Sequence, residues 1–381
     1  MMTRDDAQQG GQPRSTPLRE VHERLGASMT DFAGWLMPLR YGSETAEHRA
    51  VRGAAGLFDL SHMGEIAVTG AGAADALDYA LTGQPSALAP GRARYTMICA
   101  PDGGILDDLI VYRLADTEFM VVANAANTAV VLAELAERAG GHDAQVQDQT
   151  SDWALVAIQG PHASRILAPL TNIPLDGVRY YASQPAVVAG RPVLLARTGY
   201  TGEDGFELFT GPADAEPVWL ALTAAGGADG LRPAGLAARD TLRLEAGMPL
   251  YGNELTAQLT PFEAGLGRVV AFGKPADFVG RAALAERAEA GPAQVLAGLT
   301  IGSRRVPRHG YPVLWDGQPH GTVTSGAPSP TLGVPIAMAY LDPGVARLAT
   351  EDTAGTRLAV DIRGSAEPAR LTDLPFYHRP R

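Results

Sequence analysis

The chain has 381 residues, of which 46% are hydrophobic and 19% charged, and its formal net charge at pH 7 is -11. This length predicts two or three domains, each able to bury an apolar core. The negative charge argues against nucleic acid or an anionic membrane as the main partner, because both attract a basic surface.

Two residue types are almost absent, and each absence excludes some chemistry. Lys274 is the only lysine, and its Gly-Lys-Pro-Ala context matches neither a pyridoxal-phosphate site nor a P-loop. Cys99 is the only cysteine, which excludes internal disulfides and CxxC pairs. Its apolar neighbours favour a buried hydrophobe over a nucleophile. The histidines show no HxH or HExxH spacing, so no metal site is expected.

The N-terminal residues lack the apolar region of a secretory signal, and no apolar run is long enough to span a membrane. We therefore expect a cytoplasmic protein. Residues 1–15 are polar and glycine-rich, which predicts a flexible tail. The pattern after Thr16 predicts a short helix that Gly26 stops.

Apolar periodicity predicts further helices and strands in chain order. The strands expected are 65–69, 93–99, 105–112, 119–123, 154–159, 193–197 and 206–209. The helices expected are 73–81, 127–139, 162–170, 214–225 and 237–247. Because strands and helices mix without regular alternation, the pattern indicates an α+β fold. From about residue 295 short strands separated by Gly, Pro and Asp predict an all-β barrel or sandwich.

Asp107 and Asp108 interrupt the apolar strand 105–112. Side chains alternate along a strand, so the two carboxylates point to opposite faces. Both faces are apolar, and we expect at least one carboxylate to be partly desolvated, with a raised pKa suited to acid–base work. The preceding Gly103-Gly104 leaves open that either carboxylate is simply solvated or caps a turn.

Two other segments carry clustered charge. In the glycine-spaced loop 197–205, Glu203 offers a two-oxygen acceptor that would match a flat heterocycle, although the pattern by itself favours a tight structural turn. On the expected helix 237–247, Arg239, Asp240 and Arg243 share one side. Structural salt bridges or a clamp for a ligand carboxylate would both account for them.

Several segments in chain order resemble the glycine cleavage T-protein family of aminomethyltransferases. They run from residue 16 to the LPFY near the end and are DFAGWLMPLRY, FDLSHM, GGILDDLIVY, VVANAAN, AIQGP, RTGYTGEDGFE, LAARDTLRLEAGMPLYGNE and GTVTSGAPSPTLG. The resemblance implies a transferase of glycine catabolism and one-carbon metabolism. It would move an aminomethyl group from the lipoyl arm of H-protein to tetrahydrofolate, releasing ammonia and forming 5,10-methylenetetrahydrofolate.

The resemblance also implies roles for particular residues. Asp108 would be the catalytic residue, meeting the reacting nitrogens of tetrahydrofolate, and Asp107 would be structural. Glu203 would bind the pterin edge and Arg239 would contact the folate. Further folate-binding positions are Tyr95, Asn124, Met63, Val122 and Tyr200. Tetrahydrofolate would be a co-substrate, and no metal, pyridoxal phosphate or flavin is expected.

The implied fold is α+β, with three domains in a cloverleaf arrangement around a central folate cavity and an all-β, barrel or jelly-roll-like C-terminal domain. The expected boundaries are a tail at 1–15, a discontinuous α+β domain at 16–56 plus 149–258, a second α+β domain at 57–148 and the all-β domain at 275–381.

Three alternatives remain open. The chain could be another enzyme on the same fold, such as a demethylase or the folate domain of a sarcosine-type oxidase. It could be a non-catalytic folate protein of iron–sulfur assembly, although the K-G-C-Y-x-G-Q-E segment of that family is missing. A folate-binding regulator would keep Glu203 and Arg239 without requiring Asp108.

Overall fold

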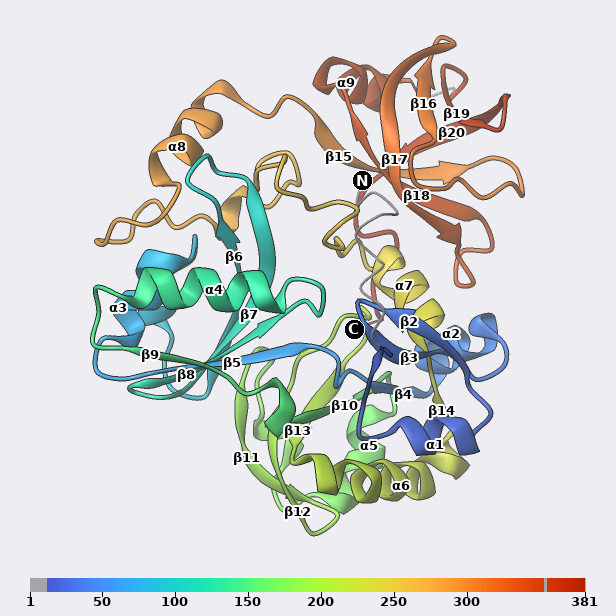
Figure 1. Cartoon of the computed structure of the whole chain (residues 1–381). Coiled ribbons are helices and arrows are strands. Elements are labelled where there is room, and N and C mark those ends of the chain that lie inside the picture. The colour runs from blue at the N-terminus through green and yellow to red at the C-terminus, as the bar shows by residue number, and fades with distance from the viewer. Residues whose placement is uncertain (1–11, 353–354, 381) are drawn as a thin grey trace.

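The structure is a computed structural model that describes residues 12–352 and 355–380. Three lobes are arranged as a cloverleaf, and the third of them is a closed barrel (Figure 1). This arrangement confirms the α+β fold and the all-β C-terminal part. None of the described helices is both long and apolar enough to cross a lipid bilayer.

The first lobe contains two sheets and five helices. Its strands are β1 (Arg14–Ser15), β2 (Ser28–Phe32), β3 (Trp35–Arg40), β4 (Ala55–Asp59), β10 (Ala154–Gln159), β11 (Ser183–Val188), β12 (Arg191–Ala196), β13 (Gly205–Thr210) and β14 (Leu231–Pro233). Its helices are α1 (Arg19–Arg24), α2 (Glu44–Gly53), α5 (Ala163–Leu167), α6 (Ala215–Gly226) and α7 (Leu236–Glu245). The strand orders are β11-β12-β13-β10-β4-β14 and β1-β3-β2.

The second lobe is one five-stranded sheet with two helices on one face. Its strands are β5 (Gly64–Thr69), β6 (Arg92–Cys99), β7 (Ile105–Ala115), β8 (Glu118–Ala123) and β9 (Gln145–Asp148), in the order β6-β7-β8-β5-β9. Its helices are α3 (Ala73–Ala80) and α4 (Thr128–Ala139). One face of the sheet packs on these helices, which leaves the other face to meet the first lobe.

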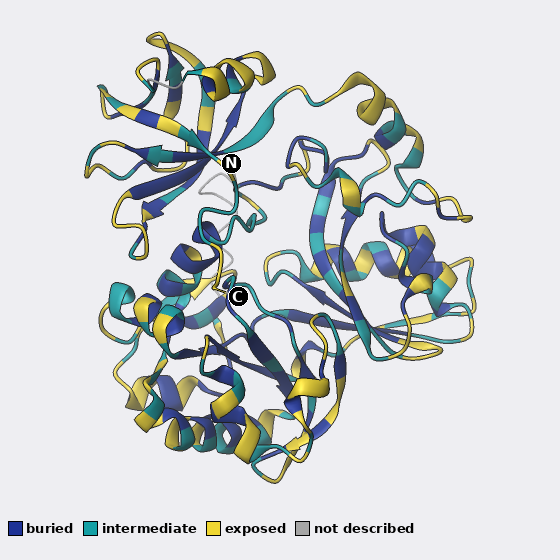
Figure 2. Cartoon of the chain, turned by 180° about the vertical axis from the view of Figure 1, so that it is seen from behind, coloured by how far each residue is buried: buried dark blue, intermediate teal, exposed yellow. Residues whose placement is uncertain are grey.

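The third lobe is a closed barrel in the order β15-β18-β17-β16-β19-β20. Its elements are β15 (Val295–Ile301), β16 (Pro312–Trp315), β17 (Gln318–Pro328), β18 (Pro335–Leu341), α9 (Pro343–Glu351), β19 (Leu358–Ile362) and β20 (Ser365–Thr372). A linker with the helix α8 (Arg281–Ala290) joins α7 to the barrel. Buried residues concentrate on the strands of the first two lobes, whereas exposed residues lie on helices, on loops and on parts of the barrel strands (Figure 2).

The elements expected from periodicity are confirmed, with ends shifted by a few residues. The elements that were not expected are the strands β1, β2, β3, β4, β9, β11, β14 and β20 and the helices α2, α8 and α9. The reason is visible in β4, which is buried throughout and lacks the alternation of a half-buried strand, and in β11, which contains Pro185.

The expected tail at 1–15 is too long at its C-terminal end. Residues 1–11 lie outside the described residues, but Arg14 and Ser15 form β1 and pair with Trp35 and Leu36 of β3. The Arg14 amide donates to the Gly34 carbonyl at 2.8 Å, and its guanidinium lies 3.9 Å from the centre of the Trp35 indole. These contacts fix two residues that composition alone assigned to the tail.

Strand pairing shows which residues belong to which lobe. Because β4 pairs with β10 and β14, residues 55–59 belong to the first lobe, and the division from the second lobe falls between Asp59 and Gly64. We propose that each lobe is a domain, with the first one interrupted in sequence by the second and with the barrel beginning at Val295.

The only lysine holds the linker against the second lobe. Lys274 is buried, and its ammonium donates to the carbonyls of Asp78, Leu81 and Gly83 at 2.5, 2.6 and 2.7 Å. These carbonyls lie at and just beyond the C-terminal end of α3, where a cation is favoured by the helix dipole. Burial lowers the pKa of Lys274 to about 8.

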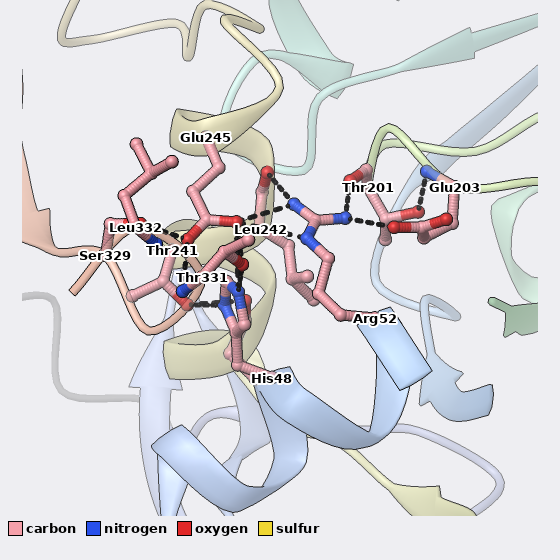
Figure 3. Close-up of polar contacts among 11 residues, drawn as sticks. His48, Arg52, Thr201, Glu203, Thr241, Leu242, Glu245, Ser329, Thr331 and Leu332 are labelled. Atoms are coloured by element: carbon pink, nitrogen blue, oxygen red, sulfur yellow. Dashed lines mark hydrogen bonds and ion pairs between the residues drawn. The ribbon is translucent and has the colours of Figure 1, made fainter. Parts of the chain in front are cut away.

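A buried carboxylate joins the first lobe to the barrel. Glu245, on α7, accepts hydrogen bonds from Arg52 at 3.0 Å and from His48 at 3.1 Å, both on α2 (Figure 3). From the turn between β17 and β18, Ser329 also donates to it, and the Thr331 hydroxyl donates at 2.7 Å. The single carboxylate therefore holds α2, α7 and the barrel in one arrangement.

We predict that Glu245→Gln destabilises the protein at neutral pH. Burial raises the pKa of Glu245, but hydrogen bonds from His48, Ser329 and Thr331 outweigh it and lower the pKa from 4.5 to about 2. A carboxylate with a lowered pKa stabilises the fold above pH 4.5, and that contribution is lost as the pH falls towards 2. The free energy of unfolding at pH 7 should fall by about 3 kcal/mol, measured by urea unfolding.

The control is Asp316→Asn, which breaks the exposed ion pair with Arg357 and should leave stability near the wild-type value. The difference between Glu245→Gln and the wild type should shrink between pH 4.5 and pH 2. A difference that stays constant over this range would contradict the assigned role of the Glu245 charge.

Candidate functional site

A cavity of about 400 Å³ lies between the first two lobes and is closed on a third side by the start of the linker. Its volume is in the range of pockets that bind small molecules. The lining side chains discussed below come from β6, β7, β8, β13, α7 and the loops that join them. The lining residues lie between Phe32 and Leu266, so none belongs to the barrel.

Strand β7 supplies the centre of one wall. Its burial alternates as expected, with Asp107 and Leu109 buried and Asp108 and Ile110 partly exposed, and the side chains of Asp108 and Ile110 line the cavity. The Tyr95 hydroxyl donates to Asp108 Oδ2 at 3.1 Å, and the Asn124 side-chain amide donates to Oδ1 at 2.8 Å. The carboxylate thus faces the cavity in a fixed orientation.

The protonation of Asp108 is shifted towards neutral pH. Burial raises the pKa of this carboxyl to about 6, although the hydrogen bonds from Tyr95 and Asn124 act in the opposite direction. A carboxylate with a pKa near 6 is ionised at pH 7, yet it binds a proton more readily than a solvated aspartate. This is the property required of a group that accepts a proton from a ligand.

Helix α7 places a cation in the cavity wall. Arg239 lies with its guanidinium 4.6 Å from the centre of the Tyr200 ring. No carboxylate or carbonyl of the described residues accepts a hydrogen bond from it, and burial lowers its pKa. Its planar donors are therefore available for a carboxylate or carbonyl of a ligand.

Arg243, one helical turn further on, has a different environment. It donates to Asp240 at 2.8 Å, to Glu254 at 2.9 Å and to Ser325 at 2.7 Å, and it is almost completely buried. For the charged cluster on this helix the sequence left open structural salt bridges or a clamp for a ligand carboxylate, and each explanation fits one of the two arginines. Arg243 is a structural cation, whereas Arg239 faces the cavity.

A second carboxylate lines the cavity on strand β13. Thr198 donates a hydrogen bond to Glu207 Oε2, and the Tyr112 hydroxyl donates to the same oxygen at 3.4 Å. No donor among the described residues reaches Oε1. Burial raises the pKa of Glu207, while the Thr198 hydrogen bond and the positive charge of Arg239 oppose this. Glu207 is thus a fixed acceptor beside an available guanidinium.

The structure does not bring Glu203 into this cavity. Its Oε1 accepts from Arg52 at 2.9 Å, and its amide donates to Thr201 Oγ1 at 3.2 Å, so it extends the polar network around Glu245 (Figure 3). The loop turns at Gly202, with φ +80°, so that Gly199 and Tyr200 line the cavity while Glu203 points towards α2.

Seven of the eight site residues expected from the sequence line the cavity, and the exception is Glu203. The seven are Met63, Tyr95, Asp108, Val122, Asn124, Tyr200 and Arg239. Their common position follows from the register, because Tyr95 and Val122 both pair with Ile110 on the central strand.

Sequence reasoning missed most of the lining residues. Those of them that carry polar groups include Glu207, Thr198, His62 and Asn127. Glu207 stands in a sequence pattern similar to that of Asp107 and Asp108, because it too is a carboxylate within an apolar strand. His62 is buried, which lowers its pKa to about 4, and its ring packs edge-on against Phe32. It is therefore neutral at pH 7. Nothing in its local sequence distinguishes it from a core histidine.

A second, wider hollow of about 1020 Å³ lies between α3, α4 and α8. Its arginines are already engaged: Arg138 donates to the Ala80 and Cys99 carbonyls, and Arg281 donates to the Phe272 carbonyl. The described residues contain no group of three or more His, Cys, Asp or Glu side chains suited to a metal ion. The smaller cavity with Asp108 is therefore the stronger candidate site.

Two family models cover most of the chain. Residues 18–274 match the GCVT N-terminal domain, and residues 294–378 match the glycine cleavage T-protein C-terminal barrel domain. Together they span the three lobes described above.

Individual proteins are similar over almost their whole length. An aminomethyltransferase from Streptomyces avermitilis is 64% identical over 370 residues, covering 96% of this chain and 98% of that protein. One from Saccharopolyspora erythraea is 62% identical, covering 96% and 99%. The crystal structure of glycine cleavage system aminomethyltransferase T from Bartonella henselae superposes with a TM-score of 0.87 at 37% identity, covering 96% and 98%.

We predict that replacing each of the two arginines of α7 affects the free energy of unfolding differently. Arg243→Met leaves the buried Glu254 carboxylate without its cation and should lower the free energy of unfolding by about 3 kcal/mol. Arg239→Met removes a guanidinium that has no acceptor in the described chain, so stability should not fall. Thermal unfolding of both variants without ligand tests this. A loss for Arg239→Met as large as that for Arg243→Met would contradict the assignment.

Proposed function

The chain belongs to the glycine cleavage T-protein family, and we infer from this membership and from the cavity that it transfers an aminomethyl group to tetrahydrofolate. The products are ammonia and 5,10-methylenetetrahydrofolate. We propose the lipoylated H-protein of a glycine cleavage system as the donor, since the matching C-terminal family model and the similar crystal structure both belong to the glycine cleavage system. Tetrahydrofolate is a substrate and is consumed in each turnover.

The observation that carries the proposal is the environment of Asp108. It is the one carboxylate on the cavity face of β7, and phenol and amide donors orient it while burial keeps its pKa near 6. A nitrogen nucleophile that forms a bond to carbon must lose its proton. A carboxylate of this kind accepts the hydrogen bond from that nitrogen and can accept its proton.

The transfer proceeds by exchange at the aminomethyl carbon. Each new bond from a tetrahydrofolate nitrogen to this carbon replaces one bond that the carbon already has, the bond to sulfur in one case and the bond to the amino nitrogen in the other. The amino group leaves as ammonia and the sulfur as the lipoyl thiol, and these two leaving groups take up the two protons that the folate nitrogens lose. The role of Asp108 is to orient the folate nitrogens against the carbon and to receive a proton during bond formation.

Glu207 and Arg239 are the residues that we propose to orient the folate. A pterin edge carries adjacent N–H donors, which a carboxylate with two oxygens can accept. We assign this contact to Glu207, because it lines the cavity, in place of Glu203, whose carboxylate is paired with Arg52. The Arg239 guanidinium would meet a carbonyl or carboxylate of the folate.

The remaining site residues shape the cavity around the flat ring system. Tyr95 and Tyr200 supply aromatic surface, Met63 and Val122 supply apolar contacts, and Asn124 holds Asp108. Flat aromatic and apolar walls with a few fixed polar groups are typical of sites for planar heterocycles.

The direct test mixes the purified chain with tetrahydrofolate and aminomethylated H-protein and measures ammonia and methylenetetrahydrofolate. We expect both products well above the uncatalysed rate. Asp108→Asn keeps the shape of the side chain but removes its charge, and it should lose at least about 100-fold in kcat while tetrahydrofolate binding largely survives. The absence of product from the wild type would overturn the proposed function. Near-normal turnover of the variant would move the catalytic role elsewhere.

A second test distinguishes the two glutamates. Glu207→Gln replaces an acceptor oxygen by a donor and should raise the KM for tetrahydrofolate by about 10- to 100-fold, as expected for a lost hydrogen bond to a charged group. The matched variant Glu203→Gln should change this KM little and should instead lower the thermal stability, because it breaks the ion pair with Arg52. A raised KM in Glu203→Gln and an unchanged KM in Glu207→Gln would show that Glu203, and not Glu207, contacts the pterin.

A further inference from the structure

Asp107 is a buried carboxylate that the mechanism above does not use. It is completely buried, yet three donors converge on it: the Asn124 backbone amide at 3.0 Å, the Asn124 side-chain amide at 2.8 Å and the Asn127 side-chain amide at 2.7 Å. Three donors and no acceptor suit the ionised form of a carboxyl group. A side chain that only filled space in the core would need none of these three donors.

The Asn124 side chain connects this carboxylate to the site. Its Nδ2 lies 2.8 Å from Asp107 Oδ1 and 2.8 Å from Asp108 Oδ1. The register explains how one amide reaches both faces of the strand. Val122 pairs with Ile110, so Asn124, just beyond the end of β8, lies beside Asp108 and is free to fold over the edge of the ladder. Its two N–H groups are thus divided between the two carboxylates.

We propose that Asp107 is a positioning residue whose ionised carboxylate holds the Asn124 amide against Asp108 and so orients the group that meets the folate nitrogen. This inference rests on the proposed function of Asp108, which it deepens. A neutral Asp107 presents a hydroxyl in place of one acceptor oxygen and holds the amides less firmly. The orientation of Asp108 therefore depends on the charge of a residue that lies outside the cavity.

The groups around Asp107 bring the pKa of its carboxyl close to neutral pH. Burial and the negative charge of Asp108 raise the pKa of Asp107 to about 7, against the hydrogen bonds from Asn127 and Asn124. The other ionisable groups near the pair are the phenols of Tyr95, Tyr181, Tyr200 and Tyr251, whose pKa values are all raised above the usual 10. They stay neutral at physiological pH, so the negative charge that raises the pKa of Asp107 is that of Asp108.

The pH dependence of kcat tests the proposal. The ionised form of Asp107 is the effective one, so the wild type should show a partial loss of kcat as the pH falls through about 7, before the loss near pH 6 that belongs to Asp108. Asp107→Asn imitates the neutral carboxyl at every pH. It should lower kcat at pH 8 by about tenfold, the cost of a weakened hydrogen bond to a charged group, and it should lack the step near pH 7.

Two further variants keep the result interpretable. Asn127→Ala removes one donor to the ionised Asp107, so the pKa of Asp107 should rise and the step should move to higher pH. The matched control Asp78→Asn removes another buried carboxylate of the second lobe, one that accepts from Ser86 and lies outside the cavity. It should leave the step in place. A uniform fall of kcat in Asp107→Asn with the step retained would overturn the proposal and leave Asp107 merely structural.

A titration without turnover separates this inference from the proposed function. Carboxyl ¹³C NMR of aspartate-labelled protein should show Asp107 titrating near pH 7 in the wild type and at lower pH in Asp108→Asn, because the neighbouring negative charge is gone. An Asp107 midpoint that is the same in both proteins would refute the coupling, whatever the enzyme assay shows. If the coupling is present but no product forms in the assay, the proposed function fails and the positional link between the two aspartates stands.

Discussion

The burial of Glu245 is the constraint on which the rest of the arrangement depends. An ionised carboxylate in a protein interior is tolerated only when donors surround it, and here they come from α2 and from the β17–β18 turn of the barrel. The fold must therefore bring these elements to α7. Because α7 also carries Arg239, fixing this helix fixes the cation of the cavity relative to β7.

The cavity itself is built from charges that the fold does not neutralise fully. Arg239 has no acceptor in the described chain, and Asp108 and Glu207 are held by neutral hydroxyl and amide donors instead of cations. Such groups cost stability in the free protein, since their desolvation is only partly offset. The contrast with Arg243 and Glu254, fully paired a single helical turn away, separates the groups kept for a ligand from those that hold the lobes together.

Sequence reasoning succeeded where the signal is local. The pair Asp107-Asp108 within an apolar strand singled out this strand, and the family resemblance then selected Asp108. Alternation assigned the two carboxylates to opposite faces, as the structure confirms. Sequence reasoning failed for Glu203 because a glycine-rich loop can direct its side chains either way, and the ion pair with Arg52 decides the direction across 151 residues of sequence. The family resemblance supplied the other six predicted residues that line the cavity, but the polar contacts of Thr198 and His62 had no local signal.

The sequence by itself therefore determined the α+β class, the strand-rich C-terminal lobe, the family and seven of the side chains that line the cavity. These features follow from periodicity and from motifs, and both can be recognised within short segments of the sequence. Tertiary structure alone decided which carboxylates face the ligand, which arginine of α7 remains available and how Asn124 links the two aspartates. The physical reason is that hydrogen bonding and desolvation depend on neighbours that are distant in the chain, and only the folded arrangement brings those neighbours together.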